Sequence, residues 1–425
     1  MIRTLFLTMG FWLIAIGLTN AQSLRIEDCY QMARSNYPAI KKMDLIAKTS
    51  DYDLQNANKR FLPQLSFSGK ATYQSEVVDY GGLLGGAMLP PGFNPPSLSK
   101  DQYSVQGEVS QLIYDGGNTK NQKELIRANA ALQQQNVESN LYTINNRINT
   151  LFFSALLMDA QLKQNQLNKA TLQSQIQKME AALQNGVAFR SNLDELKAEI
   201  ANMDMAATEY RANRRAFLKM LSLFIGKDLN EQTQLLLPEP PPSAFAIQRP
   251  ELQVFDRQHS MFKAQLNGLK TGYLPQISGF FQGAYGKPTL NILENKFGPW
   301  YITGIRFNWS LGSLYSLTNR KNALRLSEQA VEADRETFLL NTRIELSQQE
   351  ENVKKYNDLT QQDEEAIDLR ASVTKSAEAQ LANGVITTHE YIQKVNAEHL
   401  ARQNKIVHEI LLLQAKYNQK FISGN

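Results

Sequence analysis

The chain has 425 residues, of which 42% are hydrophobic and 20% charged, so its length alone suggests two or three domains with sizeable cores. Its formal net charge is only +4 and no block of Lys and Arg stands out, which argues against nucleic acid as a partner.

Residues 1–21 have the pattern of a secretory signal peptide. Arg3 supplies a positive start, Leu5–Leu18 is an apolar stretch, and Thr19-Asn20-Ala21 is a plausible cleavage site. A membrane anchor is the alternative, but the apolar stretch is short for a span of about 20 residues. Cys29 does not follow the cleavage site directly, which argues against an acylated lipoprotein. As the single cysteine it cannot form an intrachain disulfide, and we expect a buried thiol.

Residues 22–60 are predicted to form N-terminal helices, and residues 61–117 the first of two β-hairpins. From Gln64 to Glu76, polar side chains alternate with apolar or small ones, which is typical of a strand with one wet face and one apolar face.

Residues 118–226 are predicted to form a first pair of long helices. Residues 118–185 contain no proline, and apolar residues recur at intervals of three and four along Leu141–Leu162. At about 1.5 Å per residue this run would make a helix of roughly 100 Å. The pattern breaks at Asn185-Gly186, so we expect a tip near residues 185–191.

A Pro-rich linker, residues 227–250, leads to a second copy of the same order. The phrase FLPQLSFSGKATY from Phe61 returns as YLPQISGFFQGAY from Tyr273, and LQNGV from Leu183 returns as LANGV from Leu381. Such internal duplication is a strong signal. The second half is predicted to comprise a helix at 251–272, a hairpin at 273–315, and long helices at 316–425 with a tip near 383–390. Alternation in this hairpin is less regular, because Phe280 falls on the wet side.

The predicted strands are too few to form a closed sheet. A soluble hairpin packed on a core is one reading, but the narrow apolar stripes of the helices pair with one another and leave the aromatic-rich strands uncovered. Lipid could cover them instead. Only closed barrels of about eight or more strands span a bilayer, so four strands imply an obligate oligomer.

The chain resembles the TolC-like family of outer membrane efflux proteins in the order and duplication of these motifs. The likeness lies in the opening IEDCYQMARSNYPAI helix, both LPQ strand starts, YDGGNTKNQ from Tyr114, and both NGV breaks, and it covers about residues 22–424. The resemblance implies a mainly α fold with membrane β. Each half of the duplicated chain would contain a helix, two strands and a long helix, and three chains would form a homotrimer. Its 12-stranded β-barrel would continue into a long α-helical barrel.

The resemblance also implies a function in transport. The expected role is the outer membrane channel of a tripartite export system, which passes substrates from a periplasmic adaptor (membrane fusion) protein and an inner-membrane transporter. The protein would lie in the cell outer membrane, in contact with lipid, and extend into the periplasm. We expect no enzyme activity, cofactor, metal site or nucleic-acid partner.

Two sets of site residues follow from the resemblance. Partner contacts are expected at Asn185, Gly186, Val187, Ala188, Phe189, Arg190 and Ser191 of the first tip, and at Asn383, Gly384, Val385, Ile386, Thr387 and Thr388 of the second; ordinary interhelical turns are the alternative. A periplasmic gate is carried over to Glu390 and Gln393, with Asn192 and Glu195 in the first half. A solvated surface charge is the alternative for Glu390.

The sequence shows no set of catalytic residues. The four histidines, His259, His389, His399 and His408, do not cluster with Cys29 as metal ligands would, and His389 is expected to be a solvent-exposed turn residue beside Glu390. A periplasmic coiled-coil scaffold without a membrane barrel is the alternative function, since it also explains the long helices. A passive porin would place its mass in strands instead.

Overall fold

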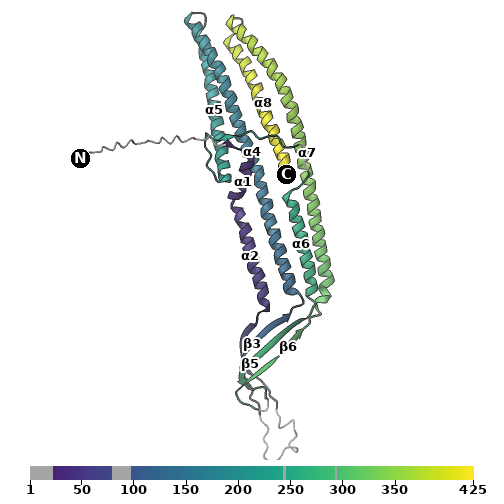
Figure 1. Ribbon diagram of the computed structural model, residues 1–425. Helices are drawn as coiled ribbons and strands as arrows, with labels where there is room; N and C mark the ends of the chain where they lie inside the picture. Colours follow the sequence, from purple (N-terminus) through teal and green to yellow (C-terminus); the bar gives the residue numbers. More distant parts are fainter. Residues whose placement is uncertain (1–22, 79–96, 243–245, 292–293) are drawn as a thin grey trace, which may run out of the picture. The chain divides into compact units, whose positions relative to one another are not determined.

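The computed structural model describes residues 23–78, 97–242, 246–291 and 294–425 (Figure 1). The predicted signal peptide lies outside the described residues. The chain forms two compact units that are not consecutive in sequence. The first takes in the chain up to Ile40, Leu141–Gln248 and Thr342–Asn425, and the second Lys41–Asn140 and Arg249–Asn341.

The second unit carries a four-stranded antiparallel sheet. Strands β2 (Gln64–Tyr73) and β3 (Asp101–Tyr114) form one hairpin, and β5 (Gln276–Lys287) and β6 (Gly298–Asn308) form the other. The sheet order is β2-β3-β5-β6, so the hairpins join through β3 and β5. Within the described residues β2 pairs only with β3 and β6 only with β5, and the sheet therefore has two open edges.

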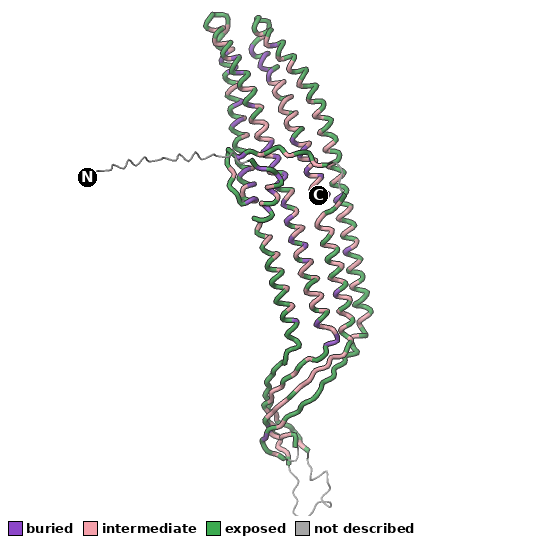
Figure 2. Tube along the Cα trace, viewed as in Figure 1, coloured by how far each residue is buried: buried purple, intermediate pink, exposed green. Residues whose placement is uncertain are grey.

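One face of this sheet is apolar and largely exposed. The register aligns Leu65, Val109 and Phe281 across three strands. Phe67 is 76% exposed and Ile305 is 74% exposed, and Figure 2 shows the strands almost entirely as exposed or intermediate. The opposite face carries polar residues such as Ser66, in agreement with the predicted alternation.

Phe280, which broke the predicted alternation, does lie on the polar face, opposite Ser110 of β3. The guanidinium of Arg306 lies 4.8 Å from the centre of its ring, and Arg306 Nη2 is 3.1 Å from Glu108 Oε1. The ring of Phe280 on this face thus packs against the Arg306 cation, which also pairs with Glu108 of β3. Strand β2 ends at Tyr73, three residues before the end of the alternating pattern at Glu76.

Helices complete the second unit. They are α2 (Lys41–Asn58), α6 (Pro250–Thr271) and the sheet-side parts of α4 (Asn118–Gln184) and α7 (Ser313–Ala382), with a short 3-10 turn at Lys59–Phe61. The motif YDGGN forms the turn from β3 into α4. Asp115 accepts hydrogen bonds from the backbone N–H groups of Gly117 and Thr119, at 2.9 and 2.6 Å, and so caps the start of α4.

The first unit contains α1 (Ile26–Asn36), a 3-10 turn at Pro38–Ile40, α5 (Arg190–Ile225), α8 (Thr388–Ser423) and the remaining parts of α4 and α7. A small parallel pair, β1 (Ser23–Leu24) and β4 (Gln234–Leu235), joins the N-terminal segment to the chain after α5. Cys29 on α1 is fully buried, which confirms the expected buried thiol, and burial raises its pKa to about 12.

None of the described helices is both long and apolar enough to cross a bilayer.

Candidate functional site

Two turns of the first unit, α4 to α5 and α7 to α8, have the same construction. Gly186 and Gly384 adopt φ of +72° and +71°, and an added Cβ at either would meet nothing within 4 Å. The backbone N–H of Val187 donates to Ala182 O at 2.9 Å, and that of Val385 to Gln380 O at 2.8 Å. These are Schellman-type helix ends, which require the left-handed conformation that glycine adopts without strain.

After the glycine, the two turns differ. Helix α8 begins with a capping box: Thr387 Oγ1 accepts from the N–H of Glu390 at 3.2 Å, and Glu390 Oε2 accepts from the N–H of Thr387 at 2.8 Å. Helix α5 begins after Phe189, which provides no side-chain cap. In the first turn the N–H of Asn192 donates instead to the backbone carbonyl of Phe189, at 3.1 Å.

The capping box gives Glu390 a structural role within its own helix. The hydrogen bonds from the Thr387 backbone and side chain hold the pKa of the Glu390 carboxyl below its usual range. The carboxylate of Glu390, a predicted gate residue, is thus hydrogen-bonded to Thr387 of its own chain at the start of α8. The pattern Thr387-x-x-Glu390 is the sequence signature of this box and could have revealed it.

Two of the other predicted gate residues meet through a histidine. His389 Nδ1 lies 2.7 Å from Glu195 Oε1 on α5, and His389 Nε2 lies 2.9 Å from Gln393 Nε2 on α8. His389 is exposed, as expected, but it is also the link between Glu195 and Gln393. The sequence prediction missed this link, because nothing in the local pattern indicates that α5 and α8 lie side by side.

A groove of about 810 Å³ lies between the two turns. Phe189 and Asn192 line it from the first turn, and Gly384 and Ile386 from the second. Between α4 and α7, Glu378 accepts from Lys178 Nζ at 2.6 Å and from Gln175 Nε2 at 2.7 Å.

An ion pair lines this groove, and exposed apolar side chains lie at its rim. The hydrogen bonds from Lys178 and Gln175 hold the pKa of Glu378 below its usual range, so this carboxylate stays ionised near neutral pH. Val187 and Phe189 are each 78% exposed at the rim, and Val385 is exposed as well. An exposed apolar rim beside ion pairs is typical of a surface that contacts another protein.

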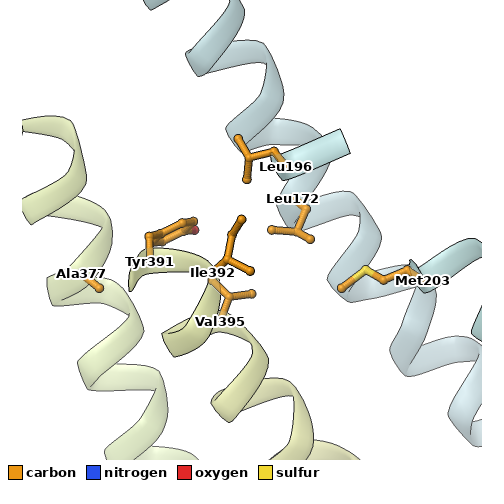
Figure 3. Close-up of a cluster of buried hydrophobic side chains, with 7 residues drawn as sticks. All are labelled: Leu172, Leu196, Met203, Ala377, Tyr391, Ile392 and Val395. Atoms are coloured by element: carbon orange, nitrogen blue, oxygen red, sulfur yellow. The ribbon is translucent and has the colours of Figure 1, made fainter. Parts of the chain in front are cut away.

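Figure 3 shows a cluster of buried apolar side chains. Met179, Leu381 and Ile386, which line the groove, pack against this cluster. It joins side chains of all four helices: Leu172, Leu196, Met203, Ala377, Tyr391, Ile392 and Val395. Tyr391 is 1% exposed, and burial raises its pKa to about 12. Because its members come from four helices, the cluster joins the helices on either side of the two turns. Among the described residues no group of three or more His, Cys, Asp or Glu is placed to hold a metal ion.

Comparison with known proteins supplies a family match over the first part of the chain, and a fold. Residues 29–227 match the family described as outer membrane efflux protein. No match was found among curated protein sequences.

Several solved structures share the fold. A structure of CusC, described in terms of transmembrane channel formation, has a TM-score of 0.69 at 13% identity and covers 94% of this chain and 92% of its own. The outer membrane protein VceC of Vibrio cholerae has 0.64 at 11%, with 94% and 96% covered. The open state of the Neisseria gonorrhoeae outer membrane channel MtrE has 0.64 at 11%, with 94% and 89% covered. The chain therefore has the mainly helical fold of these channels.

Proposed function

Starting from a chain whose residues 29–227 match the outer membrane efflux protein family and whose fold is that of TolC-like outer membrane channels, we propose that it is the outer membrane channel of a tripartite export system. It would receive substrates from a periplasmic adaptor protein and an inner-membrane transporter, and release them outside the cell.

The observation that carries this proposal is the open sheet with a largely exposed apolar face. The edges of β2 and β6 present unpaired backbone donors and acceptors, which cannot be left unsatisfied in lipid. Three copies, with β2 of each chain beside β6 of the next, would pair every edge in a 12-stranded barrel. Leu65, Phe67 and Ile305 would then face lipid, and the polar face with Glu108 and Arg306 would line the lumen.

The helical tips are the proposed docking site for the adaptor. Support comes from the exposed Val187 and Phe189 at the groove rim and from the exposed Val385 of the second turn, because large exposed apolar side chains mark contact surfaces. The predicted gate residues lie within the first two turns of α5 and α8, close behind these tips. Opening would require α8 to move away from α5.

Particle imaging of the detergent-extracted protein tests this proposal. We expect three-fold particles with a barrel at one end, together with an oligomer that falls apart on heating in SDS. A water-soluble monomer or dimer without a barrel would contradict the membrane assignment and favour the periplasmic scaffold.

A further inference from the structure

The polar face of the sheet carries a patch of large apolar side chains. Three cross-strand pairs of β5 and β6 make up this part of the face: Phe280 with Gly304, Gln282 with Ile302, and Ala284 with Trp300. Glu108 of β3 pairs with Gln282 and so lies on the same face. Phe280, Ile302 and Trp300, here called the wall patch, are half-buried or exposed, with Ile302 38% exposed. An apolar patch on an otherwise polar surface is typical of a binding site.

The neighbours of the two aromatic rings in the wall patch are small. A Cβ built at Gly304 would lie 3.4 Å from the ring of Phe280, so this ring lies over the glycine. Ala284 presents only a methyl group beside Trp300. A planar molecule can therefore lie along the wall over Ile302 without displacing a larger side chain.

Arg306 places a cation against the wall patch. Its guanidinium lies 4.8 Å from the ring centre of Phe280, and its Nη2 donates to Glu108 Oε1 at 3.1 Å. Because Glu108 lies in the same cross-strand row as Ile302, the guanidinium is drawn along the strand toward the middle of the patch. The Arg306 side chain is 52% exposed, and a guanidinium engaged with one carboxylate keeps further donors for an oxyanion.

The described strands give this face an excess of positive charge. Lys70 of β2 is exposed and pairs with Ser104, four residues from Glu108 along β3, so it lies on the same face. Asp101 of β3 falls on the opposite face. Among the acidic residues of the described strands only Glu108 is therefore on this face, and Arg306 neutralises it. Closure of the barrel would bring Lys70 of the next copy beside β6, at the border of the wall patch.

We propose that the wall patch is a weak binding site for exported organic anions that carry an aromatic ring. The inference rests on the proposed function, in which the polar face lines the lumen. The ring would lie against Ile302 and Trp300, and the anionic group would accept hydrogen bonds from Arg306. A metal cation would find no His, Cys or Met on the described strands and would be repelled by Lys70. Weak binding suits a duct, because the site must also release its cargo.

Tryptophan fluorescence of the detergent-solubilised protein tests the site directly. Trp12 belongs to the predicted signal peptide, so W309F leaves Trp300 as the reporter on the polar face. The probe is 4-nitrobenzenesulfonate, a soluble aromatic anion whose nitro group quenches tryptophan. We expect saturable quenching with a half-point on the order of 1 mM. Iodide, an anion without a ring, should quench in proportion to its concentration. The aromatic cation 4-nitrobenzyltrimethylammonium should need about fivefold more.

Variants in the W309F background separate the ring from the charge. F280S should raise the half-point about five- to tenfold, because the patch loses a ring and Arg306 loses its support. R306Q should abolish the preference for the anionic probe. E108Q should lower the half-point, because Arg306 keeps its charge while the competing carboxylate is removed. A merely structural role of these residues predicts no such gain.

The adjacent phenylalanine supplies the matched control. Phe281 pairs with Thr303 and lies on the opposite face, so F281S should keep the half-point of its parent. W300F, which leaves Trp309 as the reporter, should show no saturable quenching. Quenching of Trp300 that does not saturate, equal half-points for F280S and F281S, or equal saturation with Trp309 as the reporter overturns the inference.

Particle imaging of the same W309F preparation separates this result from the proposed function. Particles without a barrel contradict the channel role and the assignment of the wall patch to a lumen, whatever the quenching shows. Barrel particles whose Trp300 is quenched without saturation retain the function and reject the binding site.

Discussion

Arg214 is a buried cation that joins three parts of the first unit. Its side chain pairs with Asp159 of α4, and it donates to the carbonyls of Glu231 and Thr233 at 3.0 and 2.7 Å. A guanidinium is suited to this position, because its fixed fork of donors can reach a carboxylate and two carbonyls at once. It anchors the segment between α5 and β4.

Removing this side chain should loosen the segment after α5. We expect R214A to cost about 2 kcal/mol of local stability, because it leaves the Asp159 carboxylate and two carbonyls without their donor. Amide exchange at β4 should accelerate by more than tenfold. The control is R215A, which breaks an exposed pair with Glu231 and should change exchange little. Equal effects of the two substitutions would contradict the anchoring role.

At the scale of single elements, the α7 to α8 turn depends on Gly384. Because its φ is +71° and no atom crowds the missing Cβ, a substitution acts through backbone strain alone. We expect G384V to distort the turn at a cost of about 1–3 kcal/mol and to impair export, with trimers still formed. G384N should be milder, since asparagine tolerates this conformation. Loss of the trimer in G384V would contradict the assignment of this turn to the tip.

The strands offer a second test, on the two faces of β2. We expect F67R to block assembly in the membrane, because a cation on the lipid side costs about 2–4 kcal/mol at the bilayer centre. S68R, one residue on, places the same charge on the polar face and should be tolerated. Yield of the heat-sensitive oligomer from the membrane fraction is the measurement. Similar yields for the two variants would contradict the proposed orientation of the sheet.

The elements themselves could largely be predicted from the sequence, because each signal is local. Alternation predicted the strands, the proline-free run predicted α4, and Asn-Gly predicted both turns, which the structure places at Gly186 and Gly384. The contacts of the site could not be predicted in the same way. His389 and Glu195 are distant in sequence, and their pairing depends on which faces of α5 and α8 lie against each other. The trimer and the docking role remain predictions.

At the scale of the whole molecule, closure of the sheet predicts a specific cross-link. Strands β2 and β6 of one chain are separated by two others, about 14 Å at the usual strand spacing, so a disulfide between them must join different chains. We expect cysteines that replace Ser66 or Ser68, combined with one that replaces Ile302 or Gly304, to yield species of up to three chains.

The two faces supply the control for this cross-link. F67C combined with I302C places the thiols on opposite faces, and it should form no cross-link. Ladders beyond three chains, or cross-links confined to one chain, would contradict a closed trimer.

The pairing of β3 with β5 also determines the order in which the strands of the sheet can pair during biogenesis. In a chain that is exported from its N-terminus, β3 emerges early, but its partner β5 emerges only after the whole first set of helices. During that interval the first hairpin would present an aromatic surface and an unpaired edge to the periplasm, the combination that promotes aggregation. A holding chaperone would therefore be needed most by the first hairpin, and the last strand delivered, β6, would complete the surface on which three chains meet.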